Sequence, residues 1–372
     1  MYQNKRFYIP TKIYFETGIT DRLKDILKDE NFKRALLICD SFFEENGTAE
    51  EIKNKNDAVL DIFSDFTPNP MLSKVEKASK LLKELDADCV IALGGGSCLD
   101  LAKFASAYRY ADGKIQDYFF GKKKFEKHIP LIAIPTTAGT GSEVTCVSVC
   151  NDDISGIKSP LNDEKFYPYI SIVDPRLTLS VPPFVTATTG LDAMAHALEA
   201  YWCCAHRDIT DTFAVASLKS IFGSLEQAYS DTKRQNIEAR REMSKGSLFA
   251  GLAFSQTKTA AVHACSYPLS SNFYLSHGEA CAFTLDLFLL ENAKFDKRIE
   301  TLAKELGFVN VDEMASKIKY FKKKFKLKTT LADLGCKDSK KLAEECLAHP
   351  LYNNNPVKHS VEELAALLEE LK

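Results

Sequence analysis

Apolar runs of four or five residues alternate with amphipathic segments through the first half of the chain. The runs with the length of buried strands are 35–39, 59–63, 89–93, 130–134 and 170–173. The segments that repeat apolar positions at helical spacing are 19–29, 74–85 and 99–110. Residues 5–16 alternate around Pro10 and predict two more short strands. This pattern predicts an α/β domain with a largely parallel sheet.

The pattern becomes purely helical after Pro182 and Pro183. The helical segments beyond that point are 208–229, 236–255, 279–295, 296–306, 311–325 and 360–371. We therefore predict two domains, an α/β domain over 1–180 and an all-α domain over 181–372. A basic run at 322–326 predicts a solvated helix face.

Charge and composition exclude several classes of protein. The net charge is −3, so no electrostatic footprint for nucleic acid or an anionic membrane is expected. No apolar run approaches the roughly 18 residues of a transmembrane helix, and the first residues lack the apolar core of a signal peptide. The eleven cysteines form no Cys-x-x-Cys pair and stand mostly in apolar surroundings, which is typical of reduced, buried thiols. We expect a cytoplasmic protein.

Two glycine-containing loops follow predicted strands. Gly94-Gly-Gly-Ser97 lies between a strand and a helix, where backbone N–H groups can hold a phosphate, although a plain tight turn has the same sequence. Thr136 to Ser142 follows the next strand, and two such loops indicate the ligand crevice of an open α/β sheet. Asp40, at the end of the first sheet strand, can bind a ribose diol and so favour NAD over NADP, or it can cap the next helix.

One carboxylate and three imidazoles in the second half form a candidate metal site. Asp192 and His196 are four residues apart, which places both on one face of a helix. His263 and His277 are fourteen residues apart, so only the fold can bring them together. These side chains suit a divalent transition metal, but satisfied buried histidines in a helical domain remain the alternative.

Several motifs together resemble those of the iron-containing (group III) alcohol dehydrogenases. They are Gly94-Gly-Gly-Ser-x-x-Asp100-x-x-Lys103, Ile134-Pro-Thr-Thr-Ala-Gly-Thr-Gly-Ser-Glu-Val-Thr145, Gly190-Leu-Asp-Ala-x-x-His196, Ala250-Gly-x-Ala-Phe254, His263 and His277-Gly278. Each motif alone is weak, but they occur in the family's order across residues 94–278. The resemblance implies a Rossmann-like domain followed by a helical domain, the architecture shared with dehydroquinate synthase.

The resemblance also implies cofactors and residues. It implies a divalent metal, Fe²⁺ first and Zn²⁺ or Ni²⁺ otherwise, on Asp192, His196, His263 and His277. It implies NAD(P), with NAD favoured, on Asp40, Asn69, Gly95, Gly96, Ser97, Asp100, Thr136, Thr137, Thr140, Ser142, Thr145, Lys158, Leu177, Thr178 and Leu179. The implied reaction is hydride transfer between nicotinamide and a small aldehyde or primary alcohol whose oxygen the metal polarises. We expect a homodimer, because short N-terminal strands can pair between chains.

Two positions depart from the family pattern. Many members carry a second histidine four residues after the ligand that corresponds to His263, whereas this chain has Tyr267, which either takes part in proton transfer or only lines the pocket. The second position is Lys258. Its stretch Ser255-Gln-Thr-Lys-Thr259, together with Ser266-Tyr-Pro-Leu269 and Tyr201-Trp202, resembles the branch that reduces phosphonoacetaldehyde to 2-hydroxyethylphosphonate. Its ammonium can bind the anionic end of that substrate or simply face the solvent.

Three other functions compete with this one. A general short-chain alcohol or lactaldehyde reductase would use the same chemistry on an uncharged substrate. A lyase of the dehydroquinate synthase type would share the architecture, but that family has a Glu where this chain has Asp192. A non-catalytic metal- or nucleotide-binding protein would require a broken site, and all four ligand residues are present.

Overall fold

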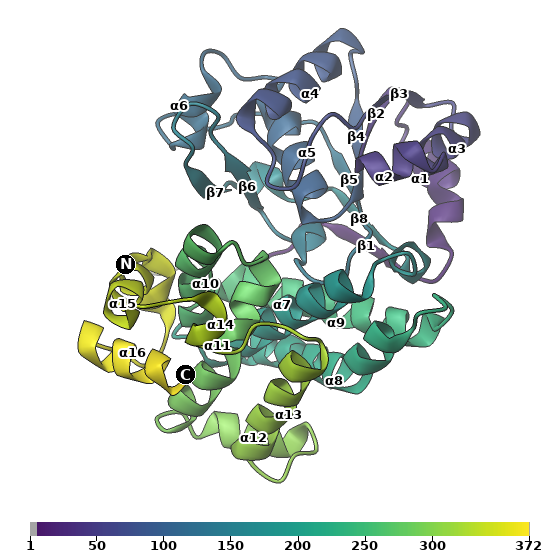
Figure 1. Ribbon diagram of the computed structural model, residues 1–372. Helices are drawn as coiled ribbons and strands as arrows, with labels where there is room; N and C mark the ends of the chain where they lie inside the picture. The colour runs from purple at the N-terminus through teal and green to yellow at the C-terminus, as the bar shows by residue number, and fades with distance from the viewer. Residues whose placement is uncertain (1–5, 372) are drawn as a thin grey trace. The chain divides into compact units, whose positions relative to one another are not determined.

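The structure, a computed structural model, describes residues 6–371 and divides into two compact units (Figure 1). The sheet unit comprises Tyr8–Thr137 and Gly141–Leu179. The helical unit comprises the chain from Ser180 onward together with Arg6, Phe7 and Ala138–Thr140. The main break in the chain thus falls at residues 179 and 180, next to the expected boundary at 180 and 181.

The sheet unit is built on six parallel strands in the order β1-β8-β5-β4-β2-β3. Their bounds are β1 Lys12–Phe15, β2 Ala35–Cys39, β3 Val59–Phe63, β4 Cys89–Gly94, β5 Leu131–Pro135 and β8 Ile170–Val173. Alternate residues of β2 enter different cores: Leu36 and Ile38 pack with helices α4 (Leu72–Glu84) and α5 (Gly96–Tyr108), and Leu37 packs with α1 (Leu23–Asp29). Helices therefore cover both faces of the sheet, which explains the continuous apolar runs and confirms the predicted parallel sheet.

Several elements of the sheet unit differ from those that the sequence pattern predicts. Only β1 forms near the N-terminus, where two strands were predicted, and Lys5 lies outside the described residues. Three short helices were missed: α2 (Ser41–Glu45), α3 (Thr48–Lys55) and α6 (Ile115–Phe119). An antiparallel pair, β6 (Val147–Asn151) and β7 (Lys158–Asn162), was also missed. None of the residues of β7 is fully buried, so the strand lacks the apolar run that indicates a strand in the main sheet.

The helical unit is all α, as predicted. Its helices are α7 Pro183–Trp202, α8 Asp208–Ser230, α9 Ile237–Thr257, α10 Ala261–Phe273, α11 His277–Ala293, α12 Arg298–Glu305, α13 Val311–Lys324, α14 Leu331–Leu334, α15 Ser339–Ala348 and α16 Val361–Leu368. α7 and α11 are buried on almost every side, as expected for helices with apolar residues all round. These two helices form the centre of the unit.

The expectation for the basic run at 322–326 is wrong at Lys322. This side chain is only 2% exposed, and its ammonium pairs with Asp286 of α11 and donates to the carbonyl of Phe283 at 3.1 Å. Burial of a charge is tolerated here because a carboxylate and a backbone carbonyl satisfy it. One member of the run thus fastens α13 to α11.

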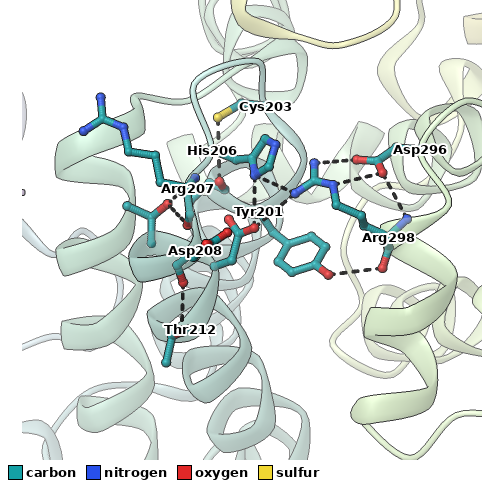
Figure 2. A network of polar contacts seen from close by, with 11 residues as sticks. Tyr201, Cys203, His206, Arg207, Asp208, Thr212, Asp296 and Arg298 are labelled. Carbon is teal, nitrogen blue, oxygen red and sulfur yellow. Dashed lines mark hydrogen bonds and ion pairs between the residues drawn. The ribbon is translucent and has the colours of Figure 1, made fainter. Parts of the chain in front are cut away.

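A polar network fixes the C-terminal end of α7 (Figure 2). The guanidinium of Arg298 contacts Asp296 at 2.6 Å, Asp211 at 3.1 Å and the Nδ1 atom of His206 at 2.6 Å. The hydroxyl of Tyr201 donates to the carbonyl of Arg298 at 3.2 Å. These bonds join the last turn of α7 to the first turns of α8 and α12, so they hold the end of the helix that carries Asp192.

Within residues 6–371, none of the helices combines the length and the apolar composition needed to cross a membrane.

Candidate metal and cofactor sites

Helix α7 presents three chemically active side chains on one face. Asp192, His196 and Glu199 lie at positions i, i+4 and i+7, and the alanines between them allow neighbouring helices to pack closely. Asp192 is 2% exposed, His196 is 5% exposed and Glu199 is fully buried. A polar stripe buried in this way requires partners from other elements.

Gly278 allows the start of α11 to approach α7. A Cβ atom at this position would lie 2.1 Å from the carbonyl oxygen of Thr188, a backbone atom that cannot move aside. The absence of a side chain thus places His277, the first residue of α11, beside Asp192. The two residues are 3.6 Å apart between Nε2 and Oδ1.

His263, from α10, meets the same carboxylate oxygen. Its Nε2 atom lies 3.5 Å from Oδ1 of Asp192. Neither of these two buried atoms has a hydrogen-bond partner among the described residues. Buried polar atoms without partners are rare, and an imidazole nitrogen facing a carboxylate oxygen suits a divalent cation between them. The donor set therefore fits the predicted metal.

His196 is placed less simply than the other predicted ligands. Its ring stacks on Phe254 with centroids 4.0 Å apart and on His263 with centroids 4.5 Å apart. Its Nδ1 atom has no hydrogen-bond partner within residues 6–371 and lies 4.0 Å from the other oxygen of Asp192, Oδ2. The group of donor atoms that lie within 4.8 Å of one another consists instead of Asp192, His263, His277 and Cys281.

Glu199 orients His263 and was missed in the sequence. Its carboxylate accepts a short hydrogen bond from Nδ1 of His263 and another from the backbone N–H of Val262 at 2.6 Å. A proton held on Nδ1 leaves the lone pair of Nε2 free for a metal. The available signal was its position seven residues after Asp192, on the same helix face.

Electrostatics keep the carboxylate of this site charged. Burial by itself raises the pKa of Asp192, but the interactions with His196, His277 and His263 outweigh burial and hold the pKa well below its usual range. Burial lowers the pKa of His196 to about 3, although Asp192 acts to raise it. An ionised carboxylate and a neutral imidazole are the forms that bind metals.

Tyr267 stacks on His349, with centroids 4.1 Å apart and rings inclined by 19°. Burial raises the pKa of the phenol, against the effect of the nearby His263. Burial has the opposite effect on His349: it lowers the pKa of the imidazole, and the charge of His263 lowers it further. Tyr267 therefore lies near the candidate metal site in its neutral form.

Lys258 ends α9 in an unusual backbone conformation, with φ 63° and ψ 177°. Almost only glycine adopts this region, because a Cβ atom is strained there. The side-chain amide of Asn354 bonds to the carbonyls on both sides, to Thr257 at 2.9 Å and to Thr259 at 3.0 Å. The Lys258 side chain is exposed. The fold thus holds a lysine in a position where glycine would be more stable.

In the sheet unit, Asp40 binds the glycine loop. Its Oδ2 atom accepts a hydrogen bond from the backbone N–H of Gly95 at 2.9 Å, and it does not cap α2. A Cβ atom on Gly94 would lie 2.5 Å from the same oxygen, so glycine is required there. β2 and β4 are neighbours whose onward connections lead to opposite sides of the sheet. Asp40 and Gly95 thus lie at the switch point where such sheets bind ligands.

Three of the predicted cofactor residues come together beside this loop. The Lys158 ammonium donates to Oδ1 of Asn69 at 2.6 Å, and the backbone N–H of Asn69 donates to the hydroxyl of Ser97 at 3.2 Å. Asn69 has a left-handed backbone, with φ 58°, a conformation that asparagine tolerates. Residues far apart in the sequence therefore share one polar cluster.

A second polar cluster, around Lys103 and Asp100 of α5, holds the end of the loop from Thr136 to Ser142. The buried ammonium of Lys103 donates to the hydroxyls of Ser142 at 2.7 Å and Thr145 at 3.2 Å. Asp100 accepts from Ser142 at 2.7 Å and from the backbone N–H of Val149 at 2.9 Å. Both oxygens of Asp100 are occupied by the protein, so its contribution is to position the loop.

The remaining predicted cofactor residues lie in less specific surroundings. Gly96 begins α5, and Thr136 and Thr137 follow β5, at the same strand edge as Asp40. Leu177 and Thr178 belong to a short 3-10 helix after β8, and Leu179 ends it. Thr140 belongs to the helical unit, whereas the other predicted cofactor residues belong to the sheet unit.

Known proteins match this chain over nearly its whole length. The family model for iron-containing alcohol dehydrogenase matches residues 10–175, and the C-terminal model of the same family matches residues 186–371. An NAD-dependent methanol dehydrogenase from Bacillus methanolicus is 31% identical over 98% of both chains. Alcohol dehydrogenase 4 from Saccharomyces cerevisiae is also 31% identical, over 98% of this chain and 97% of its own.

The solved structures agree with the sequence relatives. A sulfoacetaldehyde reductase from Bifidobacterium kashiwanohense, solved in complex with NAD⁺, superposes with a TM-score of 0.95 at 37% identity, covering 98% of each chain. A 1,3-propanediol oxidoreductase superposes with a TM-score of 0.90 at 26% identity, covering 99% of each chain. The predicted two-part architecture and the predicted resemblance are confirmed. The chain belongs to the iron-containing alcohol dehydrogenase family.

Proposed function

We propose that this protein is an NAD-linked, metal-dependent reductase of a small aldehyde that carries a sulfonate or phosphonate group. The oxidoreductase class follows from the family. The observation that carries the finer proposal is the 37% identity, over 98% of both chains, to a protein described as a sulfoacetaldehyde reductase. Phosphonoacetaldehyde, the substrate favoured by the sequence, has the same two-carbon aldehyde and an anionic end of similar shape.

The proposed metal ligands are Asp192, His196, His263 and His277, with Fe²⁺ as the first candidate and Zn²⁺ or Ni²⁺ as alternatives. Two atoms support this set, because Oδ1 of Asp192 and Nε2 of His263 are buried and have no protein partner. His196 can join through its unpartnered Nδ1 atom after a movement of its ring. When bound, the metal supplies Lewis acidity toward the carbonyl oxygen of the substrate.

The proposed NAD residues are those predicted in the sheet unit and the loop at Thr140, among which Asp100 positions the loop through Ser142 and Val149. Asp40 supports NAD over NADP, because a half-buried carboxylate at this position would repel a 2′-phosphate. The backbone N–H of Gly95 donates to this carboxylate, and the hydroxyl of Ser97 accepts a hydrogen bond from the backbone N–H of Asn69. These residues would hold the cofactor, which when bound would supply hydride for reduction of the substrate carbonyl.

Lys258 is the proposed partner of the anionic end. Its strained backbone, held by Asn354 on both sides, indicates that the position is maintained for a reason other than stability. Its ammonium is exposed and forms no ion pair among the described residues. A single cation suits a sulfonate or phosphonate as a point charge.

An aldehyde panel tests the function. Anaerobic NADH oxidation is followed with protein loaded with iron or zinc, using sulfoacetaldehyde, phosphonoacetaldehyde, lactaldehyde and propionaldehyde, and repeated with NADPH. We expect kcat/KM for an anionic aldehyde to exceed that for the uncharged ones by at least about tenfold, equivalent to about 1.4 kcal/mol. Lys258→Ala should raise KM for the anionic aldehyde about tenfold and leave that for propionaldehyde unchanged. An unchanged KM for the anionic aldehyde rejects the role of Lys258.

A general reductase of short uncharged aldehydes is the second candidate. A 1-propanol dehydrogenase from Salmonella typhimurium is 32% identical over 98% of this chain, and its name gives an uncharged alcohol. The same panel distinguishes the two, because this candidate requires propionaldehyde or lactaldehyde to be the better substrate. We also infer that the protein is a cytoplasmic homodimer.

A further inference from the structure

We propose that Cys281 is a ligand of the metal, through its thiolate. This inference rests on the proposed metal-dependent function. It assigns Cys281 the fourth position beside Asp192, His263 and His277, and His196 joins only if its ring moves. Among the described residues, donor atoms of Asp192, His263, His277 and Cys281 lie within 4.8 Å of one another. The group consists of one carboxylate, two imidazoles and one thiol.

The position of Cys281 follows from helix geometry. It lies four residues after His277 on α11, so both side chains share one face. The close approach of Gly278 to Thr188, described above, turns that face toward Asp192. The Sγ atom of Cys281 lies 3.8 Å from Nε2 of His277.

Three of the six separations within this group of four are close to the edges of a tetrahedral site. Metal–ligand distances of about 2.0–2.1 Å for nitrogen or oxygen and about 2.3 Å for sulfur imply edges of about 3.4 Å between light atoms and about 3.6 Å to sulfur. The corresponding edges here are 3.5 Å from His263 to Asp192, 3.6 Å from His277 to Asp192 and 3.8 Å from Cys281 to His277. A cation can therefore bind with shifts of a few tenths of an ångström.

Two buried atoms independently point to a ligand at this place. Oδ1 of Asp192 and Nε2 of His263 have no hydrogen-bond partner in the described part of the chain, and their residues are 2% and 4% exposed. Other cysteines of the chain satisfy their thiols with backbone carbonyls, as Cys98 does with Ile38 at 3.4 Å. The polar contact of Cys281 is instead to an imidazole of the site.

A thiolate from Cys281 would change which metal the site prefers. A thiolate is a softer donor than an imidazole or a carboxylate and favours zinc over iron at otherwise similar sites. Asp192 and Cys281 together would neutralise a divalent cation, whereas three imidazoles and one carboxylate leave a net charge of +1. The thiol thus shifts the metal preference of this chain toward zinc.

X-ray absorption on zinc-loaded wild-type protein tests the assignment without any substitution. We expect a sulfur scatterer at about 2.3 Å in addition to nitrogen and oxygen at about 2.0–2.1 Å. A shell of nitrogen and oxygen alone overturns the role of Cys281 and leaves the metal-dependent function standing. Protein that takes up no metal but still reduces aldehydes overturns both.

Variants give a second readout that does not depend on activity. Cobalt-loaded wild type should show a sulfur-to-cobalt charge-transfer band, which Cys281→Ala should lose and Cys265→Ala should keep. Cys265 is also buried in the helical unit but lies outside the group of four. Cys281→Ala should weaken zinc binding by about tenfold or more and iron binding by less. Equal zinc affinity in both variants and wild type contradicts the proposal.

Discussion

Tyr267 stands where many relatives carry a second histidine, and its surroundings indicate what the change does. The phenol is stacked on His349, and burial raises its pKa further above the neutral range. A group that stays protonated at pH 7 donates a hydrogen bond but does not carry protons back and forth. Lining the pocket is therefore the role that the structure favours for Tyr267.

Tyr267→Phe tests this role, because phenylalanine keeps the ring and its stacking and removes only the hydroxyl. We expect turnover of at least about a tenth of the wild-type value, since a positioned general acid or base contributes about a hundredfold or more. Steady-state kcat across pH 6–9 measures it, with Tyr274→Phe, an exposed tyrosine, as the control. A loss beyond about a thousandfold would instead show that the hydroxyl transfers the proton.

The backbone is strained at Lys258, in the junction between α9 and α10. Lys258 adopts a conformation almost restricted to glycine, and Asn354 holds the carbonyls that flank it. Because the strain belongs to the backbone, the length of the side chain does not relieve it. The stability of the junction and the chemistry of the ammonium can therefore be separated by substitution.

Lys258→Gly and Lys258→Ala form a matched pair, because both remove the ammonium but only glycine relieves the strain. We expect the glycine variant to be more stable than the alanine variant by about 1 kcal/mol, the lower end of the cost of such a conformation. Urea unfolding followed by circular dichroism measures the difference. Both variants should lose the preference for anionic aldehydes. Equal midpoints would mean that the junction is unstrained in solution.

At the scale of the whole molecule, the chain forms two units, each with its own core. In the sheet unit, β1 lies at the edge of the sheet and bonds to β8 on one side only. The backbone N–H of Lys12 donates to Tyr169, next to β8, so the N–H of Ile13 faces the open edge. An open edge strand is able to pair with a second copy of the chain.

Ile13→Pro tests the predicted homodimer, because proline removes an outward N–H and leaves the bonds to β8 in place. Sedimentation should show a dimer for the wild type and for Ile13→Val, which keeps the N–H, and a monomer for Ile13→Pro. Far-ultraviolet circular dichroism checks that the variant is folded. A folded Ile13→Pro dimer would place the interface elsewhere.

Elements that depend on local sequence pattern were predicted correctly, whereas contacts that depend on tertiary packing were not. The strands β2, β4 and β5 and helices such as α8 and α13 were predicted within a few residues, because their periodicity is a property of contiguous sequence. The missed pieces, such as α2 and β7, are short or have no buried face. The prediction that Lys322 faces the solvent is wrong because it pairs with Asp286, which lies thirty-six residues away in the sequence on another helix.

The sequence by itself determined the alternation of strands and helices, the glycine loops at the strand ends, and the helix face shared by Asp192 and His196. Each of these depends on neighbouring residues and on the fixed geometry of one element. Only the tertiary structure decided that Cys281 joins Asp192, His263 and His277, that Glu199 orients His263, and that the ring of His196 stacks beside the group. Those relations depend on how three helices pack, and close approach at Gly278 is a contact between distant residues that no local spacing encodes.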